Sequence, residues 1–274
     1  MSETDVPFIK MEGLGNDYIY VVLDRPDGRD WPRLARRMSD RHFGVGADGL
    51  IQILPSHTYD ARMVMYNADG SEGEMCGNGI RCIAKYLHDT GRIREKAVIE
   101  TRAGPIGVEV VAENPTRVRV DMGAPRLRPD EIPTLLREGP DSLEGLDIEG
   151  WAVSMGNPHF ISFWRADEEL PVARLGPRIE RHPAFPERTN VEFAQILDEE
   201  HIRLRVWERG TGETMACGTG ASATLVAAHL AGLTGERAVI SLPGGDLEVE
   251  WRDHVFLTGP AREAFRGTYI DDGR

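Results

Sequence analysis

The feature that most constrains the fold is an internal repeat, in which one stretch of the chain matches another 141 residues later (from 76 to 217). The turn Cys76-Gly77-Asn78-Gly79 recurs as Cys217-Gly218-Thr219-Gly220. The same offset, without gaps, pairs Gly15-Asn16 with Gly156-Asn157 and Ala97-Val98-Ile99 with Ala238-Val239-Ile240. Such a series at one spacing indicates a duplicated structural unit. We therefore expect two similar domains.

Each repeat has the pattern of a mixed structure. A strand ends in a Gly-Asn turn, more strands follow, and a CGxG turn opens a helix that leads into a pair of β-branched runs. Ile80, Ile83, Ala84 and Leu87 recur at helical spacing after the first turn, and Gly91 is expected to end that helix. The second helix, over 220–232, is small and apolar almost all round, which predicts that protein surrounds it. The pattern predicts an α+β fold of two pseudo-symmetric domains.

The repeat also predicts the domain boundaries. An N-terminal domain is expected over 1–121, completed by the C-terminal tail at 263–274, and a C-terminal domain over 122–262. Between the repeats, residues 124–150 are rich in Pro, Gly and acidic residues. This composition favours a crossover or linker over an element of the core.

The charge balance excludes some partners. The chain carries 45 Asp and Glu against 32 Lys and Arg, a formal charge of −13 at pH 7, which would repel nucleic acid and anionic membrane surfaces. The first residues have no basic region followed by an apolar run, and the longest apolar stretch, near Ala221 to Leu233, is interrupted by His229 and Gly232. We expect a cytoplasmic protein without a membrane partner.

The sequence gives no sign of a metal or a cofactor. Cys76, Cys82 and Cys217 lack CxxC spacing, which argues against a disulfide framework and a structural zinc site and favours free thiols. No HExxH or phosphate-binding loop occurs. A pyridoxal enzyme needs a buried Schiff-base lysine. The three lysines, two in polar stretches and one beside a helix face, are Lys10, Lys96 and Lys85. None has a convincing site.

Residues 44–49, GVGADG, match the dinucleotide motif GxGxxG letter for letter. That motif requires a strand before it and a helix after it. Here Arg41-His42-Phe43 does not read as a strand, whereas residues 50–54 do. We interpret the segment as a glycine-rich turn.

Cys76 and Cys217 each precede Gly-x-Gly at a predicted helix N-terminus, where unpaired N–H groups and the helix dipole favour a thiolate and a bound carboxylate. Cys82, inside its helix, is interpreted as a small buried hydrophobe. If an approximate two-fold axis relates the repeats, the two thiols face one ligand from opposite sides. The pair is then suited to act as acid and base on the two faces of one carbon.

Further polar residues cluster near these turns. Lowering a thiol pKa from about 8.5 to about 7 takes roughly 2 kcal/mol, whereas a helix terminus supplies about 0.3–1 kcal/mol. His159 and Glu208 occupy repeat positions that suggest they supply the rest; the alternatives are a surface histidine and a solvated glutamate. Four asparagines in turn-like contexts are either turn formers or parts of one binding site, namely Asn16, Asn67, Asn157 and Asn190. Arg209 is suited to bind a carboxylate.

Six motifs together resemble those of the diaminopimelate epimerase family. They are GLGNDY (13–18), GVGADGL (44–50), NADGSEGEMCGNGIRC (67–82), GNPH (156–159), RTNVEF (188–193) and WERGTGETMACGTG (207–220). The resemblance runs over essentially the whole chain. It implies two pseudo-symmetric domains, each a β-barrel-like sheet around a central helix, with the active site between them. It also implies a homodimer that needs neither pyridoxal phosphate nor a metal.

The resemblance implies an activity and a set of site residues. The activity is the interconversion of LL- and meso-2,6-diaminopimelate, a step toward lysine and peptidoglycan. Cys76 and Cys217 would be the catalytic acid and base, with His159 and Glu208 tuning the thiols. The reacting carboxylate would be held by Gly77, Asn78, Gly218 and Thr219. The amino and distal groups would be bound by Asn16, Asn67, Asn157, Asn190, Glu208 and Arg209.

Three other functions compete with this one. A proline or hydroxyproline racemase shares the two-cysteine logic, although Arg209 and the asparagines favour a substrate with a second zwitterionic end. A redox protein would close Cys76 and Cys217 into a disulfide, but the GxG after each cysteine and the lack of CxxC speak against it. A non-catalytic binding protein of the same fold is the third alternative.

Overall fold

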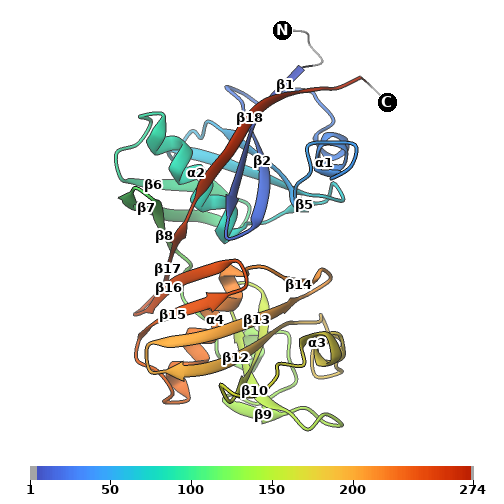
Figure 1. Cartoon of the computed structure of the whole chain (residues 1–274), viewed down its shortest axis with the longest axis vertical. Helices are drawn as coiled ribbons and strands as arrows, with labels where there is room; N and C mark the ends of the chain where they lie inside the picture. Colours follow the sequence, from blue (N-terminus) through green and yellow to red (C-terminus); the bar gives the residue numbers. More distant parts are fainter. Residues whose placement is uncertain (1–4, 273–274) are drawn as a thin grey trace. The chain divides into compact units, whose positions relative to one another are not determined.

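A computed structural model of the chain describes residues 5–272 and divides it into two compact units (Figure 1). The first unit runs to Val120 and resumes at Gly259, and the second spans Asp121–Thr258. The sequence placed these boundaries at 121/122 and 262/263. The ends of the predicted first domain, 1–4 and 273–274, lie outside the described residues.

The first unit is a mixed sheet with two helices. Its elements are β1 (Asp5–Gly13), β2 (Asn16–Val22), α1 (Trp31–Ser39), β3 (Gly49–Leu54), β4 (Ala61–Asn67), β5 (Glu72–Gly73), α2 (Gly77–Asp89), β6 (Lys96–Thr101), β7 (Gly104–Glu113), β8 (Thr116–Asp121) and β18 (Arg262–Ile270). The strands pair in the order β18-β1-β2-β3-β4-β6-β7-β8, and β5 adds to β4. The β2–β3 and β4–β6 pairs are parallel. In Figure 1, the C-terminal β18 runs beside the N-terminal β1.

The second unit repeats this plan. Its elements are the 3₁₀ turn η1 (Pro129–Glu131), β9 (Pro140–Ser142), β10 (Glu149–Ser154), β11 (Pro158–Trp164), α3 (Val172–Glu180), β12 (Asn190–Asp198), β13 (His201–Glu208), β14 (Gly212–Thr214), α4 (Gly218–Leu230), β15 (Arg237–Leu242), β16 (Gly245–Trp251) and β17 (Val255–Pro260). The strands pair in the order β9-β10-β11-β12-β13-β15-β16-β17, with β14 on β13. The β11–β12 and β13–β15 pairs are parallel.

The repeat extends to the register of the strands. Tyr18 lies opposite Gly49 in the β2–β3 pair, and 141 residues later His159 lies opposite Asn190 in the β11–β12 pair (18 to 159, 49 to 190). Helices α2 and α4 have 13 residues each and begin at equivalent positions. The predicted α+β fold with two pseudo-symmetric units is confirmed.

One helix is central to each unit. Nearly all of α2 is buried, and it packs against β1, β2, β7 and β18. Helix α4 is buried on all sides and packs against β10, β11, β12, β15 and β16. Because strands at or next to both edges of each sheet contact the same helix, each sheet wraps around it, as expected. Helix α2 ends just before Gly91, whose φ of 68° suits glycine and whose N–H donates to the carbonyl of His88.

The segment 124–150 differs from its prediction as a linker. Leu136, Leu143 and Ile148 are buried in the core of the second unit together with Phe160 and Phe193. The polar composition of the segment favoured a linker. The three apolar side chains are separated along the chain by polar residues, yet they reach the core. The prediction of a linker outside the core was wrong for these three residues.

The glycine-rich turn over 44–49 follows α1 and leads into β3, as predicted. A Cβ at Gly44 would lie 2.2 Å from the carbonyl oxygen of Arg37, and Gly46 has a φ of 80°. These glycines therefore allow the chain to turn tightly between α1 and β3. Among residues 5–272, no helix is both long and apolar enough to cross a bilayer.

Candidate active site

Cys76 and Cys217 are the N-cap residues of α2 and α4. Both have extended backbone, with φ/ψ of −135°/117° and −124°/112°. The Cys76 sulfur accepts the Gly79 N–H at 3.4 Å, and the Cys217 sulfur accepts the Gly220 N–H at 3.4 Å. Sulfur thus occupies the place that a Ser or Asp oxygen takes in an ordinary cap. The predicted position of both cysteines at helix N-termini is confirmed.

The glycines after each cysteine allow close packing on the first helical turn. A Cβ at Gly79 would lie 2.7 Å from Ile51 Cδ1, and one at Gly220 would lie 2.7 Å from Glu192 Oε1. The first-turn N–H groups, those of Gly77 and Gly218 among them, have no carbonyl partner within the helix. They are suited to a carboxylate, which is the role that the sequence predicted for them.

Around Cys76, the first unit builds a half-site from two asparagines. The Cys76 thiol donates to Asn16 Oδ1 at 3.3 Å, and Asn78 Nδ2 donates to the same oxygen at 3.2 Å. Asn16 Nδ2 donates to Asp48 Oδ2 at 2.8 Å. Because a carboxylate only accepts hydrogen bonds, Asp48 fixes the Asn16 amide with its oxygen toward Cys76.

A charged network supports this half-site. Arg41 Nη2 binds Asp48 Oδ1 at 2.9 Å and Asp17 Oδ1 at 2.8 Å. The Lys10 ammonium is paired with Asp17 and also donates to the Gly46 carbonyl. The sequence placed Lys10 in a polar stretch, but the structure buries it in β1, which pairs with β2 on one side and β18 on the other.

Asn67 lies at the end of β4, opposite Gly49, which in turn lies opposite Tyr18. Its side-chain amide donates to Ser71 Oγ at 3.0 Å within the turn that follows. Burial raises the pKa of Tyr18 well above its usual range, and the neighbouring Cys76 sulfur raises it further. Tyr18 therefore belongs to the half-site, although the sequence reasoning did not select it.

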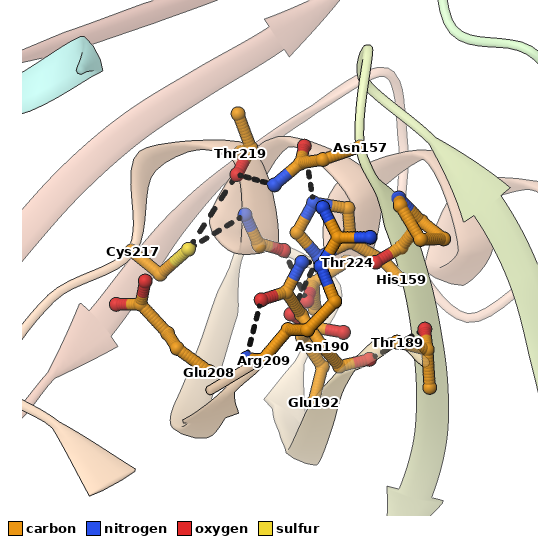
Figure 2. Close-up of polar contacts among 12 residues, drawn as sticks. Asn157, His159, Thr189, Asn190, Glu192, Glu208, Arg209, Cys217, Thr219 and Thr224 are labelled. Carbon is orange, nitrogen blue, oxygen red and sulfur yellow. Dashed lines mark hydrogen bonds and ion pairs between the residues drawn. The ribbon is translucent and has the colours of Figure 1, made fainter. Parts of the chain in front are cut away.

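Around Cys217, the second unit builds a half-site from a chain of polar contacts (Figure 2). The Cys217 sulfur lies 3.5 Å from Thr219 Oγ1, and Asn157 Nδ2 donates to Thr219 Oγ1 at 3.3 Å. His159 Nε2 lies 3.0 Å from Asn157 Oδ1, and its Nδ1 lies 2.7 Å from Glu192 Oε1. His159 thus reaches Cys217 through two intermediate side chains.

Asn190 and Arg209 connect strand and loop in the same half-site. Asn190 Nδ2 donates to the Pro158 carbonyl at 2.9 Å, and its Oδ1 accepts the Arg209 N–H at 2.9 Å. The Arg209 guanidinium is exposed and donates to the Glu187 carbonyl at 3.1 Å. Asn190 therefore holds the loop that presents Arg209, and a guanidinium has further donors for a ligand.

The effect of Glu208 differs from its prediction. Burial raises the pKa of Cys217 well above its usual range, and the charges of Glu208 and Glu192 raise it further, against the hydrogen bonds from Thr219 and Gly220. The sequence predicted that Glu208 helps a thiolate to form. A carboxylate beside a sulfur instead opposes a second negative charge. These surroundings favour the thiol form of Cys217.

None of the three cysteines forms a disulfide, and they differ in burial. Cys76 is half-buried, Cys217 is 7% exposed, and Cys82 is fully buried. Burial raises the pKa of Cys82 to about 11. Cys82 therefore has the packing role that the sequence predicted for it.

The sequence reasoning missed Glu192 and Asp48. Glu192 follows Val191 and precedes Phe193 in the quoted motif RTNVEF, and a lone carboxylate between core residues of a strand was the available signal. Asp48 lies in the segment 44–49, which the sequence predicted to be a glycine-rich turn. Among the described residues, no group of three or more His, Cys, Asp or Glu is arranged to hold a metal ion.

Comparison with known proteins agrees with this architecture. The family model described as diaminopimelate epimerase matches residues 8–128 and 151–263. A diaminopimelate epimerase of Pelotomaculum thermopropionicum is 50% identical and covers 96% of this chain and 98% of its own length. That of Moorella thermoacetica is 49% identical with the same coverages, 96% and 98%.

Solved structures of lower identity share the fold. A hydroxyproline epimerase from Agrobacterium vitis has a TM-score of 0.72 at 16% identity and covers 99% of this chain and 94% of its own. A phenazine biosynthesis protein of the PhzF family from Bacillus anthracis has a TM-score of 0.69 at 18% identity, with coverages of 98% and 100%. The sequence matches, unlike these fold matches, are high enough to settle membership: the chain belongs to the diaminopimelate epimerase family.

Proposed function

We propose that this chain interconverts LL- and meso-2,6-diaminopimelate by a two-base mechanism that uses Cys76 and Cys217. The observation that carries the proposal is the pair of cysteine N-caps, one in each unit, in a chain about half identical to diaminopimelate epimerases over nearly its full length. Both half-sites act on the same α-carbon in this proposal.

The chemistry consists of two proton transfers. The thiolate of one cysteine takes the α-proton, so that its S–H bond forms as the C–H bond breaks and the electron pair stays on carbon. The thiol of the other cysteine then gives its proton to the opposite face and becomes the thiolate. Which cysteine begins as thiolate depends on the isomer bound, and the two titrate as a coupled pair.

The substrate carboxylate shares the negative charge of the carbanion. The first-turn N–H groups at Gly77 and Gly218, with the dipoles of α2 and α4, are the donors for it. The Cys76 thiol donates to Asn16, and burial and carboxylates raise the pKa of Cys217. We therefore expect the thiolate to form when the positively charged amino groups of the substrate are in place.

The remaining predicted roles form part of the proposal. Asn16, Asn67, Asn157, Asn190, Glu208 and Arg209 bind the amino and distal groups of diaminopimelate. The exposed guanidinium of Arg209 and the carboxylate of Glu208 match a second zwitterionic end of the substrate, which proline lacks. This favours diaminopimelate over proline or hydroxyproline, and the relatives near half identity are named for diaminopimelate.

We also propose a biological setting for the reaction. The reaction is a step toward lysine and peptidoglycan, and the family resemblance supports a homodimer. Three cysteines that form no disulfide are compatible with the reducing cytoplasm, namely Cys76, Cys82 and Cys217. We propose that the reaction needs neither pyridoxal phosphate nor a metal, because the cysteine pair supplies both acid and base.

The direct test is incubation of the reduced protein with LL-diaminopimelate in D₂O, followed by NMR at the α-position. We expect formation of the meso isomer with α-deuterium, unaffected by EDTA or by hydroxylamine, which traps pyridoxal phosphate. Parallel incubations with L-proline and trans-4-hydroxy-L-proline should show no exchange. Exchange only with the proline substrates would contradict the proposal and support a proline or hydroxyproline racemase. No exchange with any of the three substrates would support a non-catalytic binding protein.

A further inference from the structure

A completely buried histidine and glutamate form one end of the chain of contacts in the Cys217 half-site. His159 on β11 and Glu192 on β12 are both completely buried, and His159 Nδ1 lies 2.7 Å from Glu192 Oε1. The same carboxylate packs against the first turn of α4, because a Cβ at Gly220 would lie 2.7 Å from Oε1. Among the described residues, the second oxygen, Oε2, has no well-aligned hydrogen bond, and burial raises the pKa of this carboxyl against the smaller effects of His159 and of the Phe160 backbone N–H.

Burial restricts the protonation of this pair. A net negative charge on a dry pair, with one carboxylate oxygen left without a well-aligned hydrogen bond, is costly. Burial raises the pKa of Glu192 and so favours the net neutral forms of the pair, which are imidazolium with carboxylate and neutral imidazole with protonated Glu192. In the first form both ring nitrogens of His159 carry protons. In the second form Glu192 donates to Nδ1, so the imidazole proton is on Nε2. Both neutral forms thus have a proton on Nε2.

A proton on Nε2 sets the direction of the whole chain in Figure 2. The Nε2–H donates to Asn157 Oδ1 at 3.0 Å, so the Asn157 amide nitrogen faces Thr219 Oγ1 at 3.3 Å. The Thr219 oxygen is then an acceptor for Asn157, and its own hydrogen is left to point at the Cys217 sulfur, 3.5 Å away. With the opposite tautomer, Asn157 would turn over and take the Thr219 hydrogen for itself.

The first unit provides an internal comparison, because the repeat places other residues at these positions. Tyr18 stands where the second unit has His159, and Ile51 stands where it has Glu192 (offset 141, 18 to 159 and 51 to 192). Ile51 Cδ1 packs on Gly79 as Glu192 Oε1 packs on Gly220. There, Asp48 fixes Asn16 with its oxygen toward the cysteine. The two asparagines are thus oriented in opposite ways. Asn16 presents its carbonyl oxygen to Cys76, and Asn157 presents its amide nitrogen to Thr219.

We propose that Glu192 is a positioning residue: with His159 it fixes the amide of Asn157 so that the Thr219 hydroxyl donates to Cys217 whenever that sulfur is a thiolate. The proposal rests on the proposed function in one respect, since it assumes that Cys217 gives and takes the α-proton. Burial and the charge of the Glu208 carboxylate both oppose a negative charge on the Cys217 sulfur. A hydroxyl hydrogen aimed at the sulfur partly offsets that opposition.

The tautomer of His159 is the direct test, and it needs no substrate. Protein labelled with ¹⁵N-histidine is examined by long-range ¹H–¹⁵N correlation near pH 7.5, and a His159→Gln variant identifies the His159 signals. We expect Nε2 to be protonated. A neutral ring with its proton on Nδ1 alone would overturn the proposal, whether or not the protein proves to be an epimerase.

A kinetic cycle tests the link to Cys217. Glu192→Gln keeps the size of the side chain but no longer dictates which ring nitrogen carries the proton, and Thr219→Val removes the hydroxyl. Loss of one hydrogen bond to a charged group lowers kcat by about 10- to 100-fold, so we expect each variant to lose that much. The double variant should lose no more than the more affected single variant, because both changes break the same chain.

Glu180 supplies a matched control. It is also a buried glutamate of the second unit, but it binds Trp207 Nε1 and the Gly210 N–H instead of the chain to Cys217. Effects of Glu180→Gln and Thr219→Val should therefore multiply. If the effects of Glu192→Gln and Thr219→Val multiply as well, Glu192 does not act through Thr219. An inactive wild-type protein would instead refute the proposed function and leave the tautomer measurement to decide the role of Glu192.

Discussion

The three cysteines differ so strongly in their surroundings that one alkylating reagent should distinguish them. Burial raises the pKa of Cys82 to about 11 and leaves its side chain inaccessible. At pH 8 a thiol with a pKa of about 11 is roughly 0.1% thiolate, whereas one with an ordinary pKa of about 8.5 is roughly 24% thiolate. Because the thiolate is the nucleophile, Cys82 should react at least about 200-fold more slowly than an exposed thiol. Cys76 is half-buried, whereas Cys217 is 7% exposed with a raised pKa.

The assay is a time course with iodoacetamide on the folded, reduced protein at pH 8, read by peptide mass spectrometry. We expect Cys76 to be modified first, Cys217 next, and Cys82 only after unfolding. The same reaction in guanidinium chloride is the control, where all three should react at similar rates. Modification of Cys217 as fast as Cys76, or of Cys82 within tenfold of Cys76, would refute the assignment of their surroundings.

Two further substitutions follow from the contacts of the second unit. Glu208→Gln removes a negative charge that raises the pKa of Cys217, so the pH midpoint for alkylation of Cys217 should move to lower pH; an unchanged or higher midpoint would contradict this effect. Gly176→Ala places a Cβ 2.6 Å from the Trp207 ring, and overpacking of this kind should lower the free energy of unfolding in urea by about 1–3 kcal/mol. Gly28→Ala, with nothing within 4 Å, is the control, and equal stability of the two variants would refute the packing argument.

Much of the fold was predictable because the repeat has no gaps. Because the spacing between matched residues is constant, the repeat preserves the strand register as well as the strand order. The pairing of Tyr18 with Gly49 therefore recurs in the pairing of His159 with Asn190. The cysteine N-caps were predictable from the glycines that follow them. The segment 124–150 was misread because its composition is polar while Leu136 and Leu143 reach the core.

The hydrogen-bond partners of the site were not predictable in the same way. Six successive residues at the start of β12 are buried, so no alternation separated Glu192 from its apolar neighbours. Asp48 orients Asn16 across 32 residues of sequence, a contact that no local pattern contains. Whether Glu208 raises or lowers the pKa of Cys217 depends on the groups that surround the sulfur. In the structure, burial raises this pKa and the charge of Glu208 raises it further.

The central claim is that two cysteines act on opposite faces of one carbon. Its most direct test is to start from each isomer of diaminopimelate in D₂O and to measure α-deuterium separately in product and in remaining substrate at low conversion. Two separate thiols predict deuterium in the product and almost none in the remaining substrate, in both directions, and no product from Cys76→Ala or Cys217→Ala. Deuterium in the remaining substrate at the same rate as in product, or product formed by either variant at the wild-type rate, would contradict the claim.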